Sequence, residues 1–260
     1  MLGWFAHLRQ RARPAHAPSV GVGQRVYAIG DVHGCLVQLQ ALLLLIIADN
    51  ARRAPAQVTL VYVGDYIDRG VASKGVLDVV RRPVVGIDKV VQLKGNHEAM
   101  LEMFLRDPVL AHGWLDNGGL ETLTSFGVDG EMARRGIDLD LARDALSVAL
   151  GPERLEWLDE RPLTHQMGDY FFCHAGVRPG VALAAQSEHD LLWIREPFLR
   201  SRADHGAVIV HGHTPGNEPE LLPNRINLDT ACFATGRLTA AVFDGDAAVT
   251  TLATAGRVSA

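Results

Sequence analysis

The 260-residue sequence predicts an α/β protein in which helices cover the faces of a sheet with parallel strands. Two observations support this fold class. First, three consecutive segments repeat one order: an apolar run typical of a β-strand, a polar loop that contains glycine, and a helical stretch. Second, short strand-like runs return after residue 161, beyond a mainly helical interval. A chain of this length is ample for a buried core.

The three repeated units occupy the first part of the chain. Each unit begins with a strand, continues through a polar loop and ends in a helix. The strands are predicted at 25–29, 58–63 and 89–93, the loops at 30–34, 64–70 and 94–97, and the helices from about 36 to 48, through 79 and through 105. This alternation is typical of parallel strands, because each helix returns the chain to the same edge of the sheet.

The later part of the chain has a different organisation. From about residue 101 to 161 the sequence is mainly helical and broken by glycines, which predicts a helical cap inserted into the domain. Strands are expected again at 170–173, 207–210, 226–228, 238–243 and 247–252. The Asp-Gly-Asp sequence at 244–246 predicts a hairpin turn between the last two strands. We assign residues 24–260 to one domain.

Residues 1–23 are expected to form a flexible basic segment and a linker. The first 13 residues carry three arginines, no acidic residue and several large apolar side chains, and Pro, Gly and Ala dominate residues 14–23. Two interpretations stay open for residues 1–13. One is a frayed terminus. The other is a short amphipathic helix that makes weak contact with an anionic membrane surface or a partner.

The composition limits the classes of protein that fit. A formal net charge of −5 and the lack of a basic, aromatic-rich patch argue against a nucleic-acid partner. Cys35, Cys173 and Cys232 are scattered and include no CxxC pair, so neither a disulfide framework nor a thiolate zinc site is indicated. No apolar run reaches the roughly 18 residues that a membrane span needs. A reducing cytoplasm is the expected location.

Polar loops at the carboxyl ends of strands are where open α/β sheets place their sites, and five such loops here carry possible metal ligands. Their oxygen and nitrogen donors, without sulfur, suit Mn, Fe, Zn or Mg. Each loop alone has a structural explanation, since Gly-Asp after a strand is most often a turn or a helix N-cap. Five together favour a metal site. The residues concerned are Asp31, His33, Asp65, Asp68, Asn96, His97, His174, His211 and His213.

These loops form an ordered set of motifs. The set resembles the phosphoprotein phosphatase branch of the calcineurin-like metallophosphoesterases, and segments 114–119 and 191–195 resemble its bacterial and phage members. The resemblance covers about residues 25 to 245, and Ala175 stands where eukaryotic members usually have glycine. The motifs are Gly-Asp-Val-His-Gly (30–34), Gly-Asp-Tyr-Ile-Asp-Arg-Gly (64–70), Gly-Asn-His-Glu (95–98), His-Ala-Gly (174–176) and His-Gly-His-Thr (211–214).

The resemblance implies a β-sandwich flanked by helices, with two divalent metal ions at its loop edge: manganese first, with iron, zinc or magnesium as alternatives. His97 would be the general acid beside Asp68, and Arg69, Arg195 and Asn96 would bind the phosphate. His211 is an alternative to His213, which the family pattern favours. The metal ligands that the resemblance implies are Asp31 and His33 for the first metal, Asp65 as the bridge, and Asn96, His174 and His213 for the second.

The chemistry of these residue types agrees with that assignment. Two cations about 3.5–4 Å apart can share a solvent molecule, lower its pKa and neutralise phosphoryl oxygens, so a hydroxide that bridges both metals is the expected nucleophile. The carboxylate of Asp65 has two oxygens to share. An alkoxide is a poor leaving group, which explains the need for an acid such as His97. The guanidinium of Arg69 matches a phosphate bidentately.

Four functions compete on the sequence alone. The leading one is a metal-dependent phosphomonoesterase, a serine/threonine protein phosphatase that acts on phosphorylated proteins or small phosphate esters. Hydrolysis of diadenosine polyphosphates is the alternative, and the cap from about residue 101 to 161 would decide between them. A catalytically inactive scaffold that binds phosphorylated partners is disfavoured because no ligand is missing. A nucleic-acid phosphodiesterase is disfavoured by the net acidity.

Overall fold

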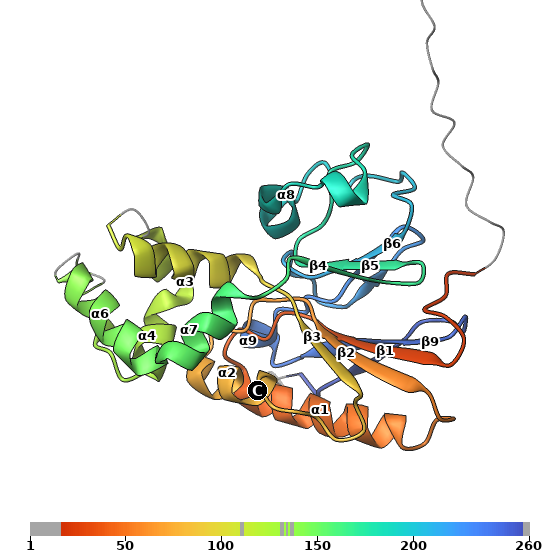
Figure 1. Cartoon of the computed structure of the whole chain (residues 1–260), viewed down its shortest axis with the longest axis horizontal. Coiled ribbons are helices and arrows are strands. Elements are labelled where there is room, and N and C mark those ends of the chain that lie inside the picture. The colour runs from red at the N-terminus through yellow and green to blue at the C-terminus, as the bar shows by residue number, and fades with distance from the viewer. Residues whose placement is uncertain (1–16, 110–111, 131–132, 134, 136–137, 257–260) are drawn as a thin grey trace, which may run out of the picture.

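The computed structural model describes residues 17–109, 112–130, 133, 135 and 138–256 (Figure 1). Its centre consists of two five-stranded mixed sheets that pack face to face. The first sheet has the order β10 (Thr250–Ala253), β9 (Thr239–Asp244), β1 (Gln24–Ile29), β2 (Gln57–Tyr62) and β3 (Lys89–Gln92). The second has the order β4 (Thr164–Met167), β5 (Tyr170–Cys173), β6 (Val208–His211), β8 (Arg225–Asn227) and β7 (Glu220–Leu221).

Each sheet contains three neighbouring strands that pair parallel. Strands β1, β2 and β3 run parallel, with Ile29 opposite Tyr62 and Tyr62 opposite Gln92. Strands β5, β6 and β8 are also parallel, whereas β9, β10, β4 and β7 pair antiparallel with their neighbours. The carboxyl ends of the parallel strands therefore lie at one edge of each sheet. The fold class expected from the sequence is confirmed, including the β-sandwich flanked by helices that the resemblance implied.

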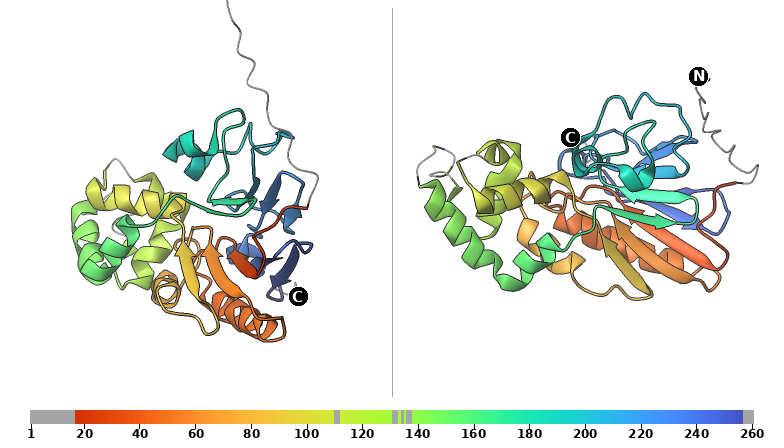
Figure 2. Two further views of the ribbon diagram at one scale, coloured as in Figure 1. Left: turned by 45° about the vertical axis from the view of Figure 1, so that its right-hand side comes forward. Right: turned by 45° about the horizontal axis from the view of Figure 1, so that its top comes forward.

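Helices cover the outer face of the first sheet and extend from one end of the molecule (Figures 1 and 2). Among them, α3, α4, α6 and α7 lie between β3 and β4, where the described residues contain no strand. The helical segments are α1 (Leu36–Asn50), α2 (Ser73–Val80), α3 (Asn96–Arg106), a π-helical turn (Leu115–Gly119), α4 (Leu120–Ser125), α6 (Leu139–Leu150), α7 (Pro152–Asp159), a 3₁₀ turn (Leu183–Ala185), α8 (Glu188–Trp193) and α9 (Cys232–Thr235).

Strand β1 shows how the sequence divides the core. Val26 and Ala28 point into the space between the sheets, where they join Phe172 of the second sheet. Tyr27 and Ile29 point to the opposite face and pack against α1, which contributes apolar side chains such as Leu42. Because successive side chains of a strand alternate between its faces, a continuous apolar run indicates a strand that is buried on both sides.

The beginning of the described chain is attached to the sandwich. The backbone N–H of Val20 donates to Gly245 (3.0 Å), that of Ser19 donates to the carboxylate of Asp169 (2.9 Å), and Val20 is 3% exposed. Within the segment expected as a linker, Ser19 and Val20 are thus bonded to the sandwich, and Val20 joins its apolar core. The amphipathic segment expected at residues 1–13 lies outside the described residues. Within the described part of the chain, no helix is long and apolar enough to cross a membrane.

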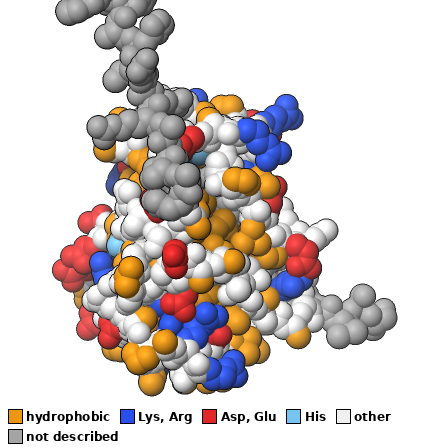
Figure 3. Space-filling view, turned by 90° about the vertical axis from the view of Figure 1, so that its right-hand side faces the viewer, with side chains coloured by type: hydrophobic (Ala, Val, Ile, Leu, Met, Phe, Trp, Pro, Cys, Tyr) orange, Lys and Arg blue, Asp and Glu red, His pale blue; other side chains and the backbone are white. Residues whose placement is uncertain are grey.

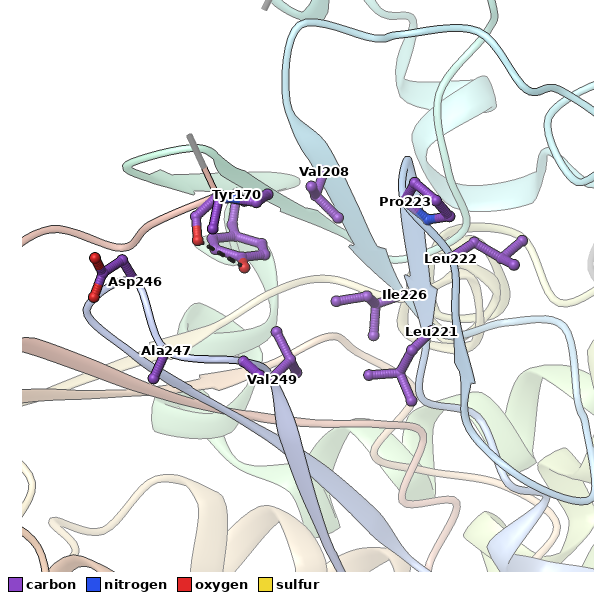
Figure 4. A pocket seen from close by; sticks show the side chains of 12 residues that line it. Tyr170, Val208, Leu221, Leu222, Pro223, Ile226, Asp246, Ala247 and Val249 are labelled. Carbon is purple, nitrogen blue, oxygen red and sulfur yellow. Dashed lines mark hydrogen bonds between the residues drawn. The ribbon is translucent and has the colours of Figure 1, made fainter. Parts of the chain in front are cut away.

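The end of the sandwich at the amino termini of β5 and β6 carries an apolar groove (Figure 4). Tyr170 and Val208 line one side of it, and Ile226 and Val249 line the other. Hydrophobic side chains gather across the middle of this face of the molecule (Figure 3). Polar loops with the predicted site residues lie at the opposite end of the strands, so groove and candidate site are separated by the length of the sheets.

Candidate metal centre

The loops after β1, β2 and β3 are tied to one another at the carboxyl edge of the first sheet. The backbone N–H groups of Val32 and His33 both donate to the carbonyl of Asp65, at 3.0 and 2.9 Å. The N–H of His97, at the start of α3, donates to the carboxylate of Asp65 (3.0 Å). Parallel pairing brings the three loops together, and these bonds fix their relative positions.

One group of side chains that could hold a metal ion consists of His33, Asp65 and His97, whose donor atoms lie within 4.8 Å of one another. His33 uses Nδ1 to donate to the carbonyl of Ile67 (2.9 Å), which leaves Nε2 facing Asp65 Oδ2 at 3.4 Å. Burial lowers the pKa of His33 to about 3. The ring is therefore neutral near pH 7 and offers a lone pair, as a metal ligand must.

The second such group consists of Asp65, His174 and His213. His174 donates from Nδ1 to the carbonyl of Val63 (3.0 Å), and its Nε2 lies 3.4 Å from Asp65 Oδ1. The side-chain oxygen of Asn96 lies 2.8 Å from a ring nitrogen of each histidine. Burial lowers the pKa of His174 and lowers that of His213 to about 3, so both rings are neutral.

Asp65 belongs to both groups. Its Oδ2 faces His33 and its Oδ1 faces His174. Burial would raise the pKa of Asp65, but the surrounding histidines outweigh it and hold that pKa well below its usual value. An ionised carboxylate with one oxygen directed to each group is the arrangement that a bridging ligand needs.

Asp31 and His211 lie outside both groups. Asp31 accepts the backbone N–H of His213 at Oδ2 (3.0 Å), and its buried Oδ1 has no hydrogen-bond donor among the described residues. His211 donates from Nδ1 to Gly212 (3.0 Å) and packs its ring against Phe198, with 5.0 Å between ring centroids. Of the two histidines at the end of β6, the structure thus brings His213 to the other candidate ligands and directs His211 away.

His97 and Asp68 form the shortest of the histidine–carboxylate contacts, with 2.6 Å between Nδ1 and Oδ2. Asp68 is fully buried and also accepts hydrogen bonds from Trp114 Nε1 (2.8 Å) and Thr122 Oγ1 (2.6 Å). Burial lowers the pKa of His97, but the carboxylates of Asp65 and Asp68 outweigh it and raise that pKa above its usual value. These contacts favour a His97 ring that carries a proton at Nδ1 and points Nε2 toward the site.

Two arginines flank the histidines. The guanidinium of Arg69 lies 3.0 Å from Nε2 of His33 and 3.0 Å from Nε2 of His97, and its Cζ lies 4.9 Å from the centre of the Phe233 ring. Arg195 follows α8 and is exposed; after burial and nearer groups, its charge contributes to the lowered pKa of His213. Arg69 is thus held at the site, whereas Arg195 extends from its rim.

Unusual backbone conformations occur at several of the same residues. A positive φ is uncommon outside glycine and tends to occur at functional sites, where the surrounding structure must hold it. Among the described residues, seven non-glycine positions have a positive φ, and five of these are predicted site residues. They are His33, Asp65, Asp68, Arg69 and His213.

Sequence reasoning missed several residues that build this centre. Glu98 is buried and accepts the backbone N–H groups of Gly95, Asp65 and Tyr66, each at 2.9 Å. Its position three residues after the Gly95 N-cap is a capping-box signal that could have found it. Asp229 is buried beside Asp31, and no local motif indicated it. Trp114 and Thr122 hold Asp68 from the cap side, across a separation of about 50 residues in the sequence.

The chemistry of the donors fits two divalent cations. The two groups offer imidazole nitrogens and carboxylate oxygens, share Asp65, and are buried. The buried Oδ1 of Asp31 needs a positive partner, because an unpaired carboxylate oxygen is costly away from water. The predicted ligands Asp31 and Asn96 lie outside the two groups, and the first group includes His97, which was predicted as the general acid.

Comparisons with known proteins agree with this geometry. Residues 24–245 match the family Calcineurin-like phosphoesterase. The chain is 30% identical to serine/threonine-protein phosphatase 1 of Salmonella typhimurium, over 84% of this chain and 91% of that protein. It is 28% identical to the asymmetrical bis(5'-nucleosyl)-tetraphosphatase PrpE of Anoxybacillus flavithermus, over 82% and 87%. A crystal structure of a candidate diadenosine tetraphosphatase shares the fold, with a TM-score of 0.61, 24% identity and coverage of 92% and 98%.

Proposed function

We propose that this chain, which belongs to the calcineurin-like phosphoesterase family and is thus a phosphatase-type hydrolase, removes phosphate from phosphoserine and phosphothreonine in proteins. The relatives with named activities include both a serine/threonine protein phosphatase and a tetraphosphatase, so membership alone leaves the substrate open. The arrangement of the general acid supports the protein phosphatase.

We assign metal binding to the loops at the carboxyl ends of the parallel strands. Asp31, His33 and Asp65 would hold one cation, and Asp65, Asn96, His174 and His213 the other. Bound divalent cations would neutralise phosphoryl oxygens and strengthen water as a nucleophile. The protein itself keeps the histidines neutral by burial and fixes their orientation through the carbonyls of Ile67 and Val63.

The observation that carries the proposal is the contact between His97 and Asp68. Asp68 holds Nδ1 of His97 at 2.6 Å, and Nε2, which accepts from Arg69 here, would carry a proton to a leaving oxygen once Arg69 binds the phosphate instead. Hydrogen bonds from Trp114 and Thr122 fix Asp68, so the acid is oriented before substrate binds. Arg69, 3.0 Å from the same Nε2, is placed to bind phosphate oxygens beside it.

Such an acid matters most when the leaving group is an alkoxide. The side chain of serine or threonine leaves as a strong base and must gain a proton, whereas a nucleotide leaves as a stable phosphate anion. The cap side of the pocket beside Arg69 carries the carboxylates of Asp116 and Glu121, which disfavour a long polyphosphate. Both features favour a phosphorylated side chain over a dinucleoside polyphosphate.

One observation favours the second candidate, hydrolysis of diadenosine polyphosphates. Phe233 is partly exposed beside Arg69 in the same pocket, and an aromatic ring near a phosphate-binding arginine can stack on a base. Asn117 also lines that pocket, although its amide donates to the carbonyl of Gly113 (2.7 Å).

The two substrates can be separated by comparing kcat/KM for a phosphothreonine peptide and for diadenosine tetraphosphate, with manganese present and after chelation. We expect phosphate release from the peptide, dependent on metal, with a larger kcat/KM than for the dinucleotide. Efficient and exclusive cleavage of the dinucleotide would contradict the protein phosphatase and support the second candidate. Activity that persists without metal would contradict both.

We also propose the metal, the cellular location and the role of the cap. Manganese is proposed as the metal because the donors are oxygen and nitrogen atoms only. A bacterial enzyme that acts in the cytoplasm is proposed from the bacterial type of its motifs and from the absence of a disulfide-type cysteine pattern. The helices around residues 101–161 are proposed as a cap that selects the substrate, since Trp114, Asp116 and Glu121 come from them.

A further inference from the structure

Asp229 is a buried carboxylate that the assignments above leave without a role. It follows β8, is 1% exposed, and reaches the same edge of the sheets as the candidate ligands. Its Oδ1 accepts the backbone N–H of Ala231 (2.9 Å), and its backbone carbonyl accepts the N–H of Gly216 (2.9 Å). Its Oδ2 is buried and has no hydrogen-bond donor among the described residues.

Asp229 lies directly beside Asp31. The residues before them touch, because a Cβ on Gly30 would lie only 2.2 Å from the carbonyl oxygen of Leu228. The two carboxyl groups are within hydrogen-bonding reach of each other. Asp31 also has one buried oxygen without a donor, Oδ1, which lies next to Gly212. Apart from each other, the two carboxyl groups find no hydrogen-bond donor among the described residues for one oxygen each.

Two neighbouring buried carboxyl groups need either a shared proton or a compensating cation. Burying one unpaired carboxylate costs several kcal/mol, and two adjacent carboxylates add mutual repulsion. Arg69 is directed to the rings of His33 and His97, and no arginine among the described residues bonds to the two carboxyl groups. A metal ion held by Asp31 would supply that positive charge.

We propose that Asp229 is a positioning residue for the first metal, and that its Oδ2 adds a second non-bridging carboxylate to the Asp31 side of the centre. This inference rests on the proposed metal-dependent function. With Asp229 included, the two proposed metal sites differ in the number of carboxylate charges. The first would have Asp31 and Asp229 beside the shared Asp65, whereas the second has only neutral groups beside Asp65.

The charge difference predicts an order of binding. A divalent cation binds more tightly where more carboxylate charge faces it, so the first side fills at a lower metal concentration than the second. A purely structural role for Asp229 is the competing explanation, because Oδ1 holds the turn at Ala231. An asparagine keeps that oxygen and removes the charge, which separates the two explanations.

The test compares the wild-type full chain with Asp229→Asn after removal of metals. Manganese binding is measured by calorimetry, and thermal unfolding is followed with and without manganese. We expect two wild-type sites of unequal affinity. In Asp229→Asn the tighter site should weaken by about 10–100-fold, as for other residues that support metal ligands, while the weaker site changes little. Without metal, the variant should melt at the same or a higher temperature, because repulsion between the two carboxylates is relieved.

Asp49→Asn is the matched control. Asp49 is a carboxylate of the first sheet's helix layer that bonds to Tyr27 and Arg53, away from the site. Its replacement should lower the melting temperature and leave both manganese affinities unchanged.

Unchanged affinities in Asp229→Asn, or a metal-free variant that melts lower or fails to fold, would overturn the inference while leaving the proposed function intact. A wild-type chain that binds no manganese would overturn both. A weakened tight site in a chain without phosphatase activity would support the inference and count against the function alone.

Discussion

Replacing His97 by asparagine tests the general acid directly. Asparagine removes the ring that Asp68 holds at 2.6 Å and that presents Nε2 to the site. Asp68 keeps its donors Trp114 and Thr122, so the buried carboxylate is not left unsatisfied and the fold should persist. The variant therefore changes the supply of a proton with little change in the surrounding structure.

The magnitude follows from what the acid does for each leaving group. General acid catalysis contributes about 10²–10⁴-fold in rate, which is about 2.7–5.4 kcal/mol of barrier. A phosphoserine peptide needs that proton in full, so kcat for His97→Asn should fall by about 10²–10⁴-fold. Nitrophenyl phosphate has a better leaving group and should lose about tenfold or less, since protonation assists its departure little.

The assay measures kcat for both substrates in the wild type and in the variant, with manganese at saturation. Asp68→Asn is the companion variant: it keeps the His97 ring but removes the charge that orients and protonates it. We expect the same selective loss, smaller in size. Equal losses for the peptide and for nitrophenyl phosphate in His97→Asn would refute the acid role and make His97 a residue that holds the site in shape.

Three other substitutions test separate parts of the structure. Asp65→Asn should weaken both metals together, because each of its oxygens faces one group, and metal analysis that found full content would contradict the bridge. Trp114→Phe removes the 2.8 Å bond to Asp68 and should cost about 1–3 kcal/mol in the free energy of unfolding; an unchanged denaturation midpoint would show that the bond contributes nothing. Hydrogen bonds from Arg178 hold the pKa of Asp190 below its usual value, so its stabilisation is present above the unfolded pKa of about 4 and is lost as pH falls below it. The stability difference between wild type and Asp190→Asn should therefore shrink in acid, and a constant difference from pH 7 to pH 3 would argue against the ion pair.

Part of the centre could be predicted because several of its residues share short sequence motifs. Asp65, Asp68 and Arg69 share one loop, and Asn96 and His97 are neighbours. Parallel pairing then places the loops at one edge whatever the details of packing. The roles assigned to these residues stay predictions, whereas the family and the fold class are established.

The choice between His211 and His213 shows where sequence reasoning stops. Residues two apart in a strand share a face, so both histidines would point the same way if β6 simply continued. The backbone of His213 instead has φ of 65°, which directs its ring to Asn96, while His211 stays with Phe198. Nothing in the local sequence predicts this turn at His213, because contacts with the surrounding loops impose it.

The sequence by itself determined the βα alternation, the order of the loops and the donor types at each loop, since these depend on local pattern and on the rule that parallel strands end at one edge. Only the tertiary structure decided which partners complete the centre. Glu98 joins two loops through backbone N–H groups, Trp114 reaches Asp68 from the cap, and Asp229 comes to lie beside Asp31 from nearly 200 residues away. Such contacts arise from packing between distant segments, and a linear pattern carries no record of which distant side chains will be buried together.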